Sequence, residues 1–325
     1  MNLLADAIDQ AGKAAVDTPD ELAKMADAAK LVADIAAIDP AAAAPANAPT
    51  AAQTAALKDA LAALGVPNAA GLTDAQVAAI AAALANAAPA DANTLSEVAA
   101  IAAAAKDAMD KLGAFAATEG GSPSGTGAND GTTGGASGTP TADDYKAAGV
   151  TGVTADNVAA VNAALASAAV TKDGANSPSE VQAVVDAYSA ILGATPSGAA
   201  AGTASATTPP TAVSVAQLKA VGVDAAALKD PSVGTAAEKA VAQNALDLIN
   251  SVISTAADAA VDTPDELNKI IAAANKVAAL ADGDAATNPA SALSKDDLKA
   301  LGVPNADSMT PEQVAAVAAA LASVD

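Results

Sequence analysis

The residues of this chain that could do acid–base chemistry are pairs of adjacent carboxylates. Asp20 and Glu21 form one pair, and Asp265 and Glu266 form another within a second copy of the same nine-residue stretch, AAVDTPDEL. Two carboxylates can act together in sugar hydrolysis, but a sugar site normally also needs aromatic platforms, and the chain has two Tyr, one Phe and no Trp. We therefore interpret these carboxylates as residues that begin helices, where the positive end of the helix dipole favours them.

The residue types on which most other catalytic sites depend are missing from the sequence. It contains no His, no Cys and no Arg. Ser–His and Cys–His nucleophiles, zinc sites built on His or Cys, and arginine clamps are therefore excluded. The sequence predicts that the protein is not an enzyme.

Calcium is the one ion for which the sequence offers candidate ligands. Three segments place oxygen ligands beside a turn-forming glycine: Asp282–Asp284, Asn129–Gly131 and Lys172–Gly174. None completes an EF-hand loop, which alternates acidic residues, a glycine and a distant glutamate. An ordinary Asp-Gly or Asn-Asp turn is the simpler interpretation. We predict no cofactor and leave calcium open.

The charge of the chain excludes two classes of partner. Its formal net charge is −22, from 37 acidic and 15 basic residues. Nucleic acid needs clustered Lys and Arg to neutralise its phosphates, and an acidic surface is also repelled by anionic lipid. No apolar run reaches the roughly 18 residues of a membrane-spanning helix without a charge or a helix breaker. We expect neither a nucleic-acid partner nor membrane insertion.

The composition predicts an all-α protein. Hydrophobic residues make up 52% of the sequence, whereas aromatic residues make up 1%. Most of the apolar share is alanine, which has the highest helix propensity and the smallest apolar side chain. Helices should therefore form readily, strands should be rare, and the cores should be thin.

Recurring capping boxes predict where helices begin. In a capping box, a Ser or Thr hydroxyl accepts from the amide three residues later, and a Glu or Gln there accepts from the cap's own amide. One class opens a helix with a clear apolar period and occurs at Thr18, Thr94, Ser177 and Thr263. A second class opens the helix before it and occurs at Thr73, Thr235 and Thr310, with a weaker version at Thr154.

A Gly-Val pair stands upstream of each second-class box, at Gly65, Gly149, Gly222 and Gly302. Glycine suits the left-handed position that ends a helix. The repeating unit is therefore a helix, a Gly-Val turn, a second helix and a capped third helix. This pattern predicts tandem small three-helix bundles joined by Gly/Ser/Thr/Pro/Ala-rich linkers. The predicted parts are a partial module at 1–37, three-helix modules at 50–113, 141–193 and 213–281, linkers at 114–140 (flexible) and 194–212, and a partial module at 292–325.

The unit resembles the GA module, a three-helix bundle repeated in bacterial surface proteins, and the GA-like repeats of very large secreted bacterial proteins. The segments that carry the resemblance are Leu298–Val303, Tyr145–Val150 and Val181–Leu192. It implies an extracellular or bacterial cell-surface location. Some GA modules bind serum albumin through an apolar patch on the second and third helices. Here that region is mostly alanine, with Tyr188 as its aromatic residue, so albumin binding is not carried over.

Two functional hypotheses follow. In the first, the chain is a structural segment of a bacterial cell-surface or biofilm-matrix protein, in which small bundles set reach and spacing. In the second, it is an adhesin-type array whose helix faces recognise a host or matrix protein. Clustered aromatic or large aliphatic residues on the outer faces would favour binding, whereas the sequence has mainly Ala, Lys and Asp there. Met25, Met109 and Tyr188 are expected in the core.

The ends of the chain suggest a further hypothesis. Aligning the two AAVDTPDEL copies places the first residues midway through a second helix, and aligning the boxes places the last residues midway through one. The simpler interpretation is an excerpt of a longer array. The alternative is head-to-tail self-association, which does not close and would form a filament. In this alternative both ends expose unpaired apolar stripes that would drive the joining: Leu22, Met25 and Val32 at one end and Val314, Val317 and Leu321 at the other.

Overall fold

The computed structural model describes residues 2–11, 16–39, 48–116, 138–167, 170, 175–196, 212–282 and 293–323. Throughout these residues the regular structure is helical, with no strand, which confirms the all-α prediction. None of the described helices combines the length and apolarity that are needed to cross a membrane.

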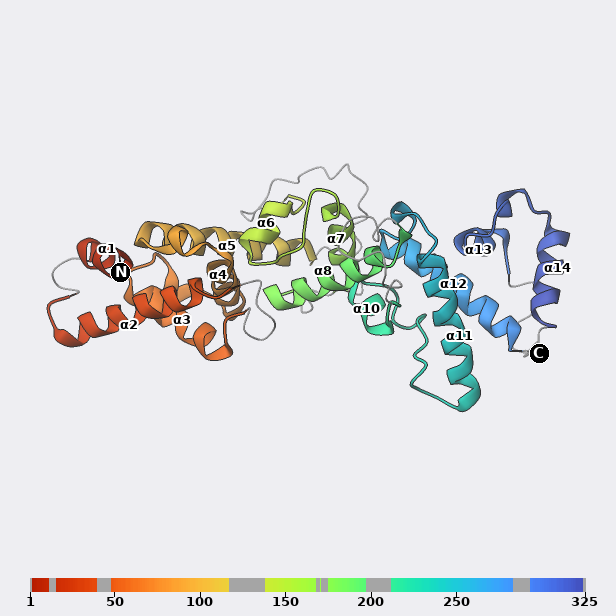
Figure 1. Cartoon of the computed structure of the whole chain (residues 1–325), viewed down its shortest axis with the longest axis horizontal. Helices are drawn as coiled ribbons and strands as arrows, with labels where there is room; N and C mark the ends of the chain where they lie inside the picture. The colour runs from red at the N-terminus through yellow and green to blue at the C-terminus, as the bar shows by residue number, and fades with distance from the viewer. Residues whose placement is uncertain are drawn as a thin grey trace. The chain divides into compact units, whose positions relative to one another are not determined.

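The α-helices follow one another along the chain, and 3₁₀ turns precede α4, α5, α12 and α14 (Figure 1). Their bounds are α1 Asn2–Gln10, α2 Pro19–Ala36, α3 Ala51–Ala63, α4 Asp74–Asn86, α5 Leu95–Ala116, α6 Ala142–Ala147, α7 Val158–Leu165, α8 Pro178–Gly193, α10 Val215–Ala220, α11 Ala236–Ile253, α12 Pro264–Ala281, α13 Lys295–Ala300 and α14 Pro311–Leu321.

The predicted capping boxes begin the second and third helices of the repeat. At the start of α12, the Glu266 amide donates to Thr263 Oγ1 at 3.3 Å, and the Thr263 amide donates to Glu266 Oε2 at 3.2 Å. Reciprocal bonds of this kind confirm the predicted boxes at Thr18, Thr73, Thr94, Thr235 and Thr310. The Ser177 hydroxyl also accepts from the Glu180 amide, at 3.4 Å. At the weaker box only the Thr154 amide bond to Asn157 Oδ1 forms, at 2.8 Å.

Four more capping boxes, which the sequence-based prediction did not include, begin the first helix of each repeat. They stand at Thr50, Thr141, Ser214 and Ser294 and open α3, α6, α10 and α13. The third helical residue is Gln in α3 and α10 but Asp in α6 and α13. All three classes of helix in the repeat therefore begin with the same local device.

The Gly-Val turns end the first helices as predicted. Gly65, Gly149, Gly222 and Gly302 all have φ between 74° and 86°, in the left-handed region that favours glycine. After α3, the Gly65 amide donates to Ala62 O at 3.1 Å and the Val66 amide donates to Leu61 O at 2.9 Å. These two bonds satisfy carbonyls that the end of a helix would otherwise leave free.

The chain divides into two compact units. The first contains residues 1–162 and 171–183, and the second contains residues 163–170 and 184–325. Their boundary runs through α7 and α8, inside the predicted module at 141–193, and not through the predicted linkers at 114–140 and 194–212. The arrangement as separate three-helix bundles is therefore not confirmed.

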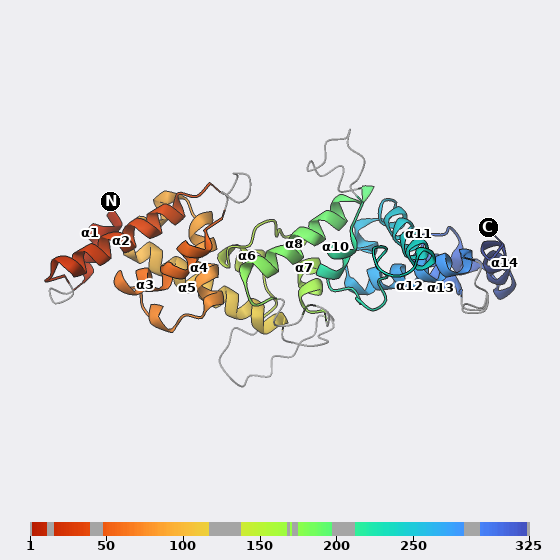
Figure 2. The ribbon, with the colours of Figure 1, turned by 90° about the horizontal axis from the view of Figure 1, so that it is seen from below.

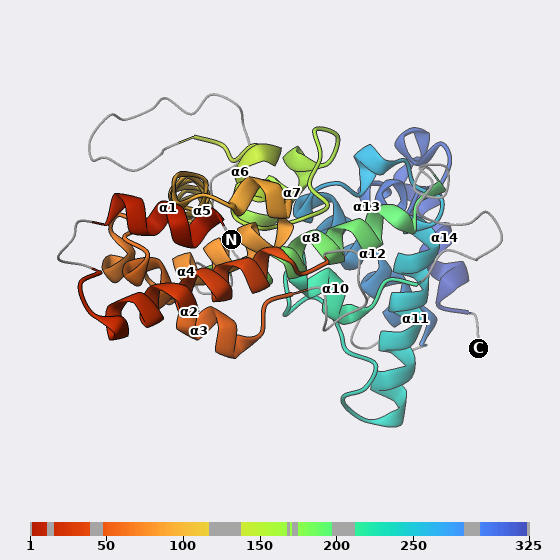
Figure 3. The same ribbon diagram turned by 60° about the vertical axis from the view of Figure 1, so that its left-hand side comes forward.

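In the first unit each third helix packs on two different neighbours. Helix α5 packs against α4, the second helix of its own repeat, and also against α6, the first helix of the next (Figure 2). Helix α2 packs in the same way on the following α3 and also contacts α4 (Figure 3). The short α1 lies on α2 and α5. Residues 114–116, predicted as linker, belong to α5.

The second unit repeats this packing. Helix α12 lies along α11 and contacts α13 and α14 of the next repeat. Leu280 of α12 belongs to one apolar cluster with Leu298, Val314 and Ala318. In both units, therefore, the third helix of one repeat and the first helix of the next share a core.

Small side chains dominate these cores, as the composition predicts. Met25, Met109 and Tyr188 are buried, which confirms their expected core positions. The largest side chains that are fully enclosed are the two tyrosines, Tyr145 and Tyr188, followed by Ile and Leu residues.

Candidate functional site

The contact between a third helix and the next first helix carries an ion pair in both units. In the first unit, Lys111 Nζ of α5 lies 2.6 Å from Asp144 Oδ2 of α6. In the second unit, Lys276 Nζ of α12 lies 2.8 Å from both carboxylate oxygens of Asp297, in α13. We call these contacts the junction pairs. They link helices that are separated in the sequence by residues 117–141 and 282–294.

Each junction aspartate is also the third residue of its helix and closes the capping box. Asp297 Oδ2 accepts from the Ser294 amide at 2.8 Å and from its hydroxyl at 2.6 Å. Burial opposes ionisation of this carboxyl, but the hydrogen bonds from Lys276 and Ser294 outweigh burial and hold its pKa below the ordinary value. The pKa of Asp144 is lowered in the same way, by Lys111 and Thr141 against burial. One carboxylate thus both starts a helix and attaches it to the preceding repeat.

Asp297→Gln should separate these two roles, because glutamine already closes the box at Gln53 and Gln217. We expect the helix start to survive and unfolding of α13 to become easier by about 1 kcal/mol through loss of the ion pair. The contribution of Asp297 is present above the pKa of the unfolded aspartate and is lost as pH falls through its lowered folded value.

Hydrogen exchange of residues 293–300 in the parent and in Asp297→Gln, from about pH 3 to about pH 7, would measure the loss of α13 stability. The exposed pair Lys299–Asp307 provides the control, and Asp307→Asn should change little. Equal effects of the two substitutions would show that the junction pair does not hold α13 in place.

Two of the Gly-Val turns lie against a second helix of the preceding repeat. A Cβ on Gly149 would meet Ala82 Cβ at 2.3 Å and the Ala83 amide nitrogen at 2.8 Å. Asn86 Nδ2 of α4 donates to Gly149 O at 3.0 Å. A Cβ on Gly222 would likewise lie 1.8 Å from Ser167 Oγ. The backbone of the turn therefore approaches its neighbour too closely for any side chain.

A buried polar pair holds α6 against α7. Tyr145 Oη donates to Asn162 Oδ1 at 2.7 Å, and Asn162 Nδ2 donates to Pro140 O at 2.8 Å. Both side chains are buried, and burial raises the pKa of the Tyr145 phenol. The Tyr145 hydroxyl and both polar side-chain atoms of Asn162 therefore each have a hydrogen-bond partner. The pair fixes the position of α6 by hydrogen bonds as well as by packing.

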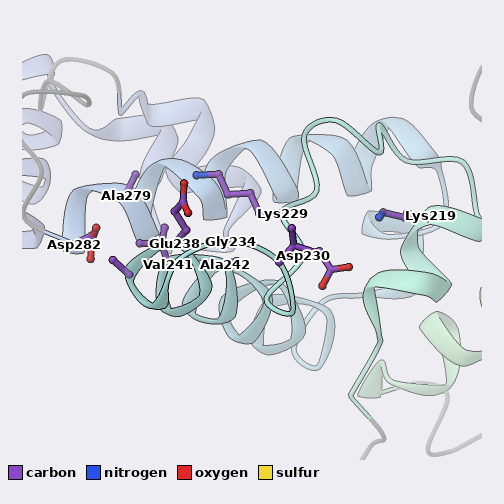
Figure 4. Close-up of a pocket in the computed structure, with 11 residues that line it drawn as sticks. Lys219, Lys229, Asp230, Gly234, Glu238, Val241, Ala242, Ala279 and Asp282 are labelled. Atoms are coloured by element: carbon purple, nitrogen blue, oxygen red, sulfur yellow. The ribbon is translucent and has the colours of Figure 1, made fainter.

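A groove of about 710 Å³ lies between α11 and α12 in the second unit (Figure 4). Its walls include Lys229, Glu238 and Asp282, with Val241 and Ala242 on the α11 side. Hydrogen bonds from the Thr235 amide and hydroxyl lower the pKa of Glu238. Val233 stands at the rim with 68% of its surface exposed. The groove combines a small apolar floor with charges of both signs.

The carboxylate pairs lie where the helix-start interpretation puts them. Glu21 and Glu266 close capping boxes, and Asp20 and Asp265 stand in the first turns of α2 and α12. Among the described residues, no three carboxylates gather to hold a metal, and no buried side-chain N or O lacks a hydrogen bond. The three segments for which calcium was left open lie outside the described residues, apart from Asp282.

Asp262 lies just before Thr263, the capping residue of α12, and the pKa of its carboxyl is raised. Burial raises its pKa, with further contributions from the hydrogen bond and charge of Glu266, to about 6. The folded chain therefore holds a proton on Asp262 more tightly than the unfolded chain does, in which the pKa of the aspartate has its ordinary value of 3.8. Stability contributed by this group is present below that value and is lost as pH rises through about 6.

Asp262→Asn should therefore make α12 more stable at neutral pH and flatten its stability profile between about pH 4 and pH 7. Asp17→Asn is the matched control, because Asp17 holds the same place in the first AAVDTPDEL copy but is exposed. Hydrogen exchange of residues 264–281 and 19–36 would report both effects. A pH profile of α12 that is unchanged by Asp262→Asn would contradict the assignment.

The residues predicted to join the chain ends have different surroundings. Met25, Val32 and Val314 are buried within the chain, and Val317 and Leu321 are partly buried on the cluster of α12 and α13. Leu22 is the exception, with 43% of its surface exposed. The expectation that all six side chains are unpaired is therefore wrong for the three buried ones. They pack within their own units because each end also contacts a neighbouring repeat.

The described residues thus form repeat junctions, and a groove lies between α11 and α12. No protein-family model, curated protein or solved structure matches this chain.

Proposed function

We propose that the protein is a non-enzymatic structural repeat segment of a bacterial extracellular or cell-surface protein, acting as a spacer or matrix-forming array. The observation that supports it most is the packing of a third helix on the first helix of the next repeat, at α2–α3, α5–α6 and α12–α13. Repeat arrays are held together by such nearest-neighbour interfaces. The resemblance to GA-like repeats supports the surface location, and the acidic charge would keep such an array soluble.

The repeat that we propose is a three-helix module that shares its third helix with the module that follows. In this arrangement the packing and the junction pairs set the spacing of modules, and the length of the segment between α5 and α6 does not. A spacer built in this way keeps its dimensions when the intervening sequence varies. That property suits a protein whose role is to hold other parts at a set distance.

Cutting the chain between α5 and α6 tests this proposal. A protease site would be inserted within residues 120–137 and cleaved, and the products followed by size-exclusion chromatography at physiological salt. We expect the two fragments to stay together through the α5–α6 interface. Lys111→Glu, which opposes Asp144 with a like charge, should release them more readily. Immediate separation of the parent fragments would leave a string of independent bundles and overturn the proposal.

The second candidate is an adhesin-type binding array, and the groove between α11 and α12 favours it. These are the second and third helices of their repeat, the faces on which a partner helix or peptide would lie. The chain, attached to beads, would be exposed to serum and to spent culture medium. A saturable partner that is lost with Val233→Asp, at an exposed rim position, would replace the spacer proposal.

A further inference from the structure

Within the second unit, the third helix α8 contacts the turn that begins the next third helix, α12. Tyr188 Oη donates to Val261 O at 3.3 Å, and both residues are buried. Thr195 Oγ1, just after α8, lies 2.5 Å from Asp258 Oδ1 in the 3₁₀ turn Asp258–Ala260. Burial raises the pKa of the Tyr188 phenol, so the hydroxyl keeps its proton and remains a donor at neutral pH. We call this set of hydrogen bonds the α8–α12 contact.

Carboxyl groups lie directly beside the α8–α12 contact. Asp262 follows Val261 in the chain and is half-buried. The charges that act on Asp262 are those of Glu266, in the first turn of α12, and Asp258. From α8, the titratable group that faces these carboxyls is the Tyr188 phenol. The surroundings of Asp262 are therefore acidic, and they oppose its ionisation.

Asp262 and Glu266 interact through a side-chain hydrogen bond as well as through charge. Glu266 Oε2 also accepts from the Thr263 amide at 3.2 Å and from the Thr263 hydroxyl at 2.8 Å. Because the capping box occupies Glu266 as an acceptor, the proton of the pair belongs on Asp262. The two carboxyls attract each other while they share this proton and repel each other once it is lost.

The first unit contains the same contact without the titratable pair. Helix α2 packs on the 3₁₀ turn Pro89–Ala92, which precedes α5. Alignment at the capping residues places Ala29 of α2 on Tyr188, and Asn93 on Asp262. The Asn93 amide donates to Glu97 Oε2 at 3.1 Å, and its side chain does not ionise. An amide is therefore compatible with this position, and the carboxyl of Asp262 adds a response to protons.

We propose that the α8–α12 contact is a pH-dependent joint, which is closed while Asp262 and Glu266 share a proton and loosens when both carboxyls are ionised. Repulsion then displaces Asp262 from Glu266. The Val261 carbonyl is part of the same peptide group as the Asp262 amide, so it moves too, and its bond to Tyr188 weakens.

The direction of the response follows from the raised pKa of Asp262. The folded chain holds this proton up to about pH 6, whereas the ordinary value is 3.8. The joint is therefore closed at pH 5 and loosened at pH 8. This goes beyond the proposed structural role, since it makes one repeat boundary stiffer in mildly acidic surroundings and leaves the α2–α5 boundary unchanged.

Hydrogen exchange of residues 184–195 tests the proposal on the α8 side, away from the titrating residues. Corrected for the chemical effect of pH on exchange, opening of this segment should increase about tenfold from pH 5 to pH 8. The pKa difference sets an upper limit of about 100-fold, which the partial exposure of Asp262 reduces. Residues 25–36 of α2 are the internal control and should change little.

Substitutions of single carboxyls identify the group that is responsible. Asp262→Asn should keep the joint closed at both pH values, as Asn93 does in the first unit. Glu266→Gln preserves the capping box, because Gln76 closes the same box in α4, and it should also abolish the increase. Asp265→Asn is the matched control, since Asp265 is an exposed carboxyl in the same helical turn. This variant should respond to pH as the parent does.

Tyr188→Phe tests whether the tyrosine transmits the effect to α8. The variant lacks only the hydroxyl, so residues 184–195 should open about fivefold more at pH 5, the effect of one hydrogen bond. Their further increase at pH 8 should become smaller, whereas the pH response of residues 264–281 should persist. An effect confined to the stability of α12 would not produce this difference.

A distance measurement reports the loosening directly. The sequence has no cysteine, so Ser189→Cys and Ala272→Cys, at exposed positions of α8 and α12, allow specific spin labelling. We expect a narrow distance distribution at pH 5 that broadens at pH 8, and no broadening when Asp262→Asn is added.

Opening of residues 184–195 that is independent of pH would overturn the proposal, as would a pH response that survives Asp262→Asn. Neither result would affect the cleavage test of the structural array, which concerns α5 and α6, so failures of the two proposals are distinguishable.

Discussion

Gly149→Ala is expected to destabilise the α6–α7 region by about 3 kcal/mol, which combines two separate costs. The left-handed φ of 80° disfavours any residue with a Cβ. The new Cβ would also stand 2.8 Å from backbone atoms of Ala82 and Ala83, so α4 itself would have to shift. Hydrogen exchange of residues 142–165, followed by mass spectrometry, would measure the change because it reports opening segment by segment.

Gly65→Ala is the matched control for this substitution. Gly65 has a φ of 81° in the same kind of turn, but nothing lies within 4 Å of the added Cβ. Only the conformational cost remains, so we expect about 1 kcal/mol. If both substitutions destabilise the protein equally, the Gly149 turn does not approach α4 as closely as described.

Tyr145→Leu is expected to cost about 3 kcal/mol, although leucine is the residue that other first helices have at this position. Leu61, Leu218 and Leu298 are its counterparts, and all are buried. The cost at position 145 arises because Asn162, buried opposite, would lose the hydroxyl that donates to its Oδ1. The smaller side chain would also leave a cavity.

Adding Asn162→Ala should recover about half of that loss. The counterparts of Asn162 in α4 and α14 are Ala81 and Ala318, both buried, so the double variant reproduces the Leu–Ala combination found there. Hydrogen exchange of residues 142–147 in the parent, the two single variants and the double variant completes a double-mutant cycle. Additive effects would show that the two side chains do not depend on each other.

The local features of this fold could be predicted from the sequence because their causes are local. A capping box lies within four residues and a Gly-Val turn within two, so the helix starts at Thr18 and Thr263 and the turn at Gly65 could be recognised. The boxes at Thr50 and Ser214 follow the same Gln rule and could have been found. Those at Thr141 and Ser294 have Asp in place of Glu or Gln, and a search that admitted Asp would have found them.

The packing between repeats could not be predicted in the same way. Helices α5 and α6 are separated by Gly/Ser/Thr-rich sequence that is typical of a linker, and nothing local shows that they share a core. The junction pair Lys111–Asp144 spans this separation. The prediction of exposed apolar stripes at the chain ends was partly wrong for the same reason, since Met25 is buried and Val314 belongs to the cluster that contains Leu280 of the preceding repeat.

The placement of the junction lysines has a consequence for how such similar repeats avoid exchanging partners. Aligned at their capping threonines, α5 and α12 place Lys276 on Asp107 and Lys111 on Leu280, so the two lysines stand on different turns. If α13 were to fold onto α5 in the manner of α12, Asp297 would face Asp107, a like-charge contact. Folding α6 onto α12 would instead place Asp144 beside Leu280, where it loses its ion pair. The correct pairing is thus favoured at both junctions, by a repulsion in one case and by the lost ion pair in the other. Near-identical helices in a long chain are prone to misassembly during refolding, and this offset gives α6 and α13 different preferred docking partners.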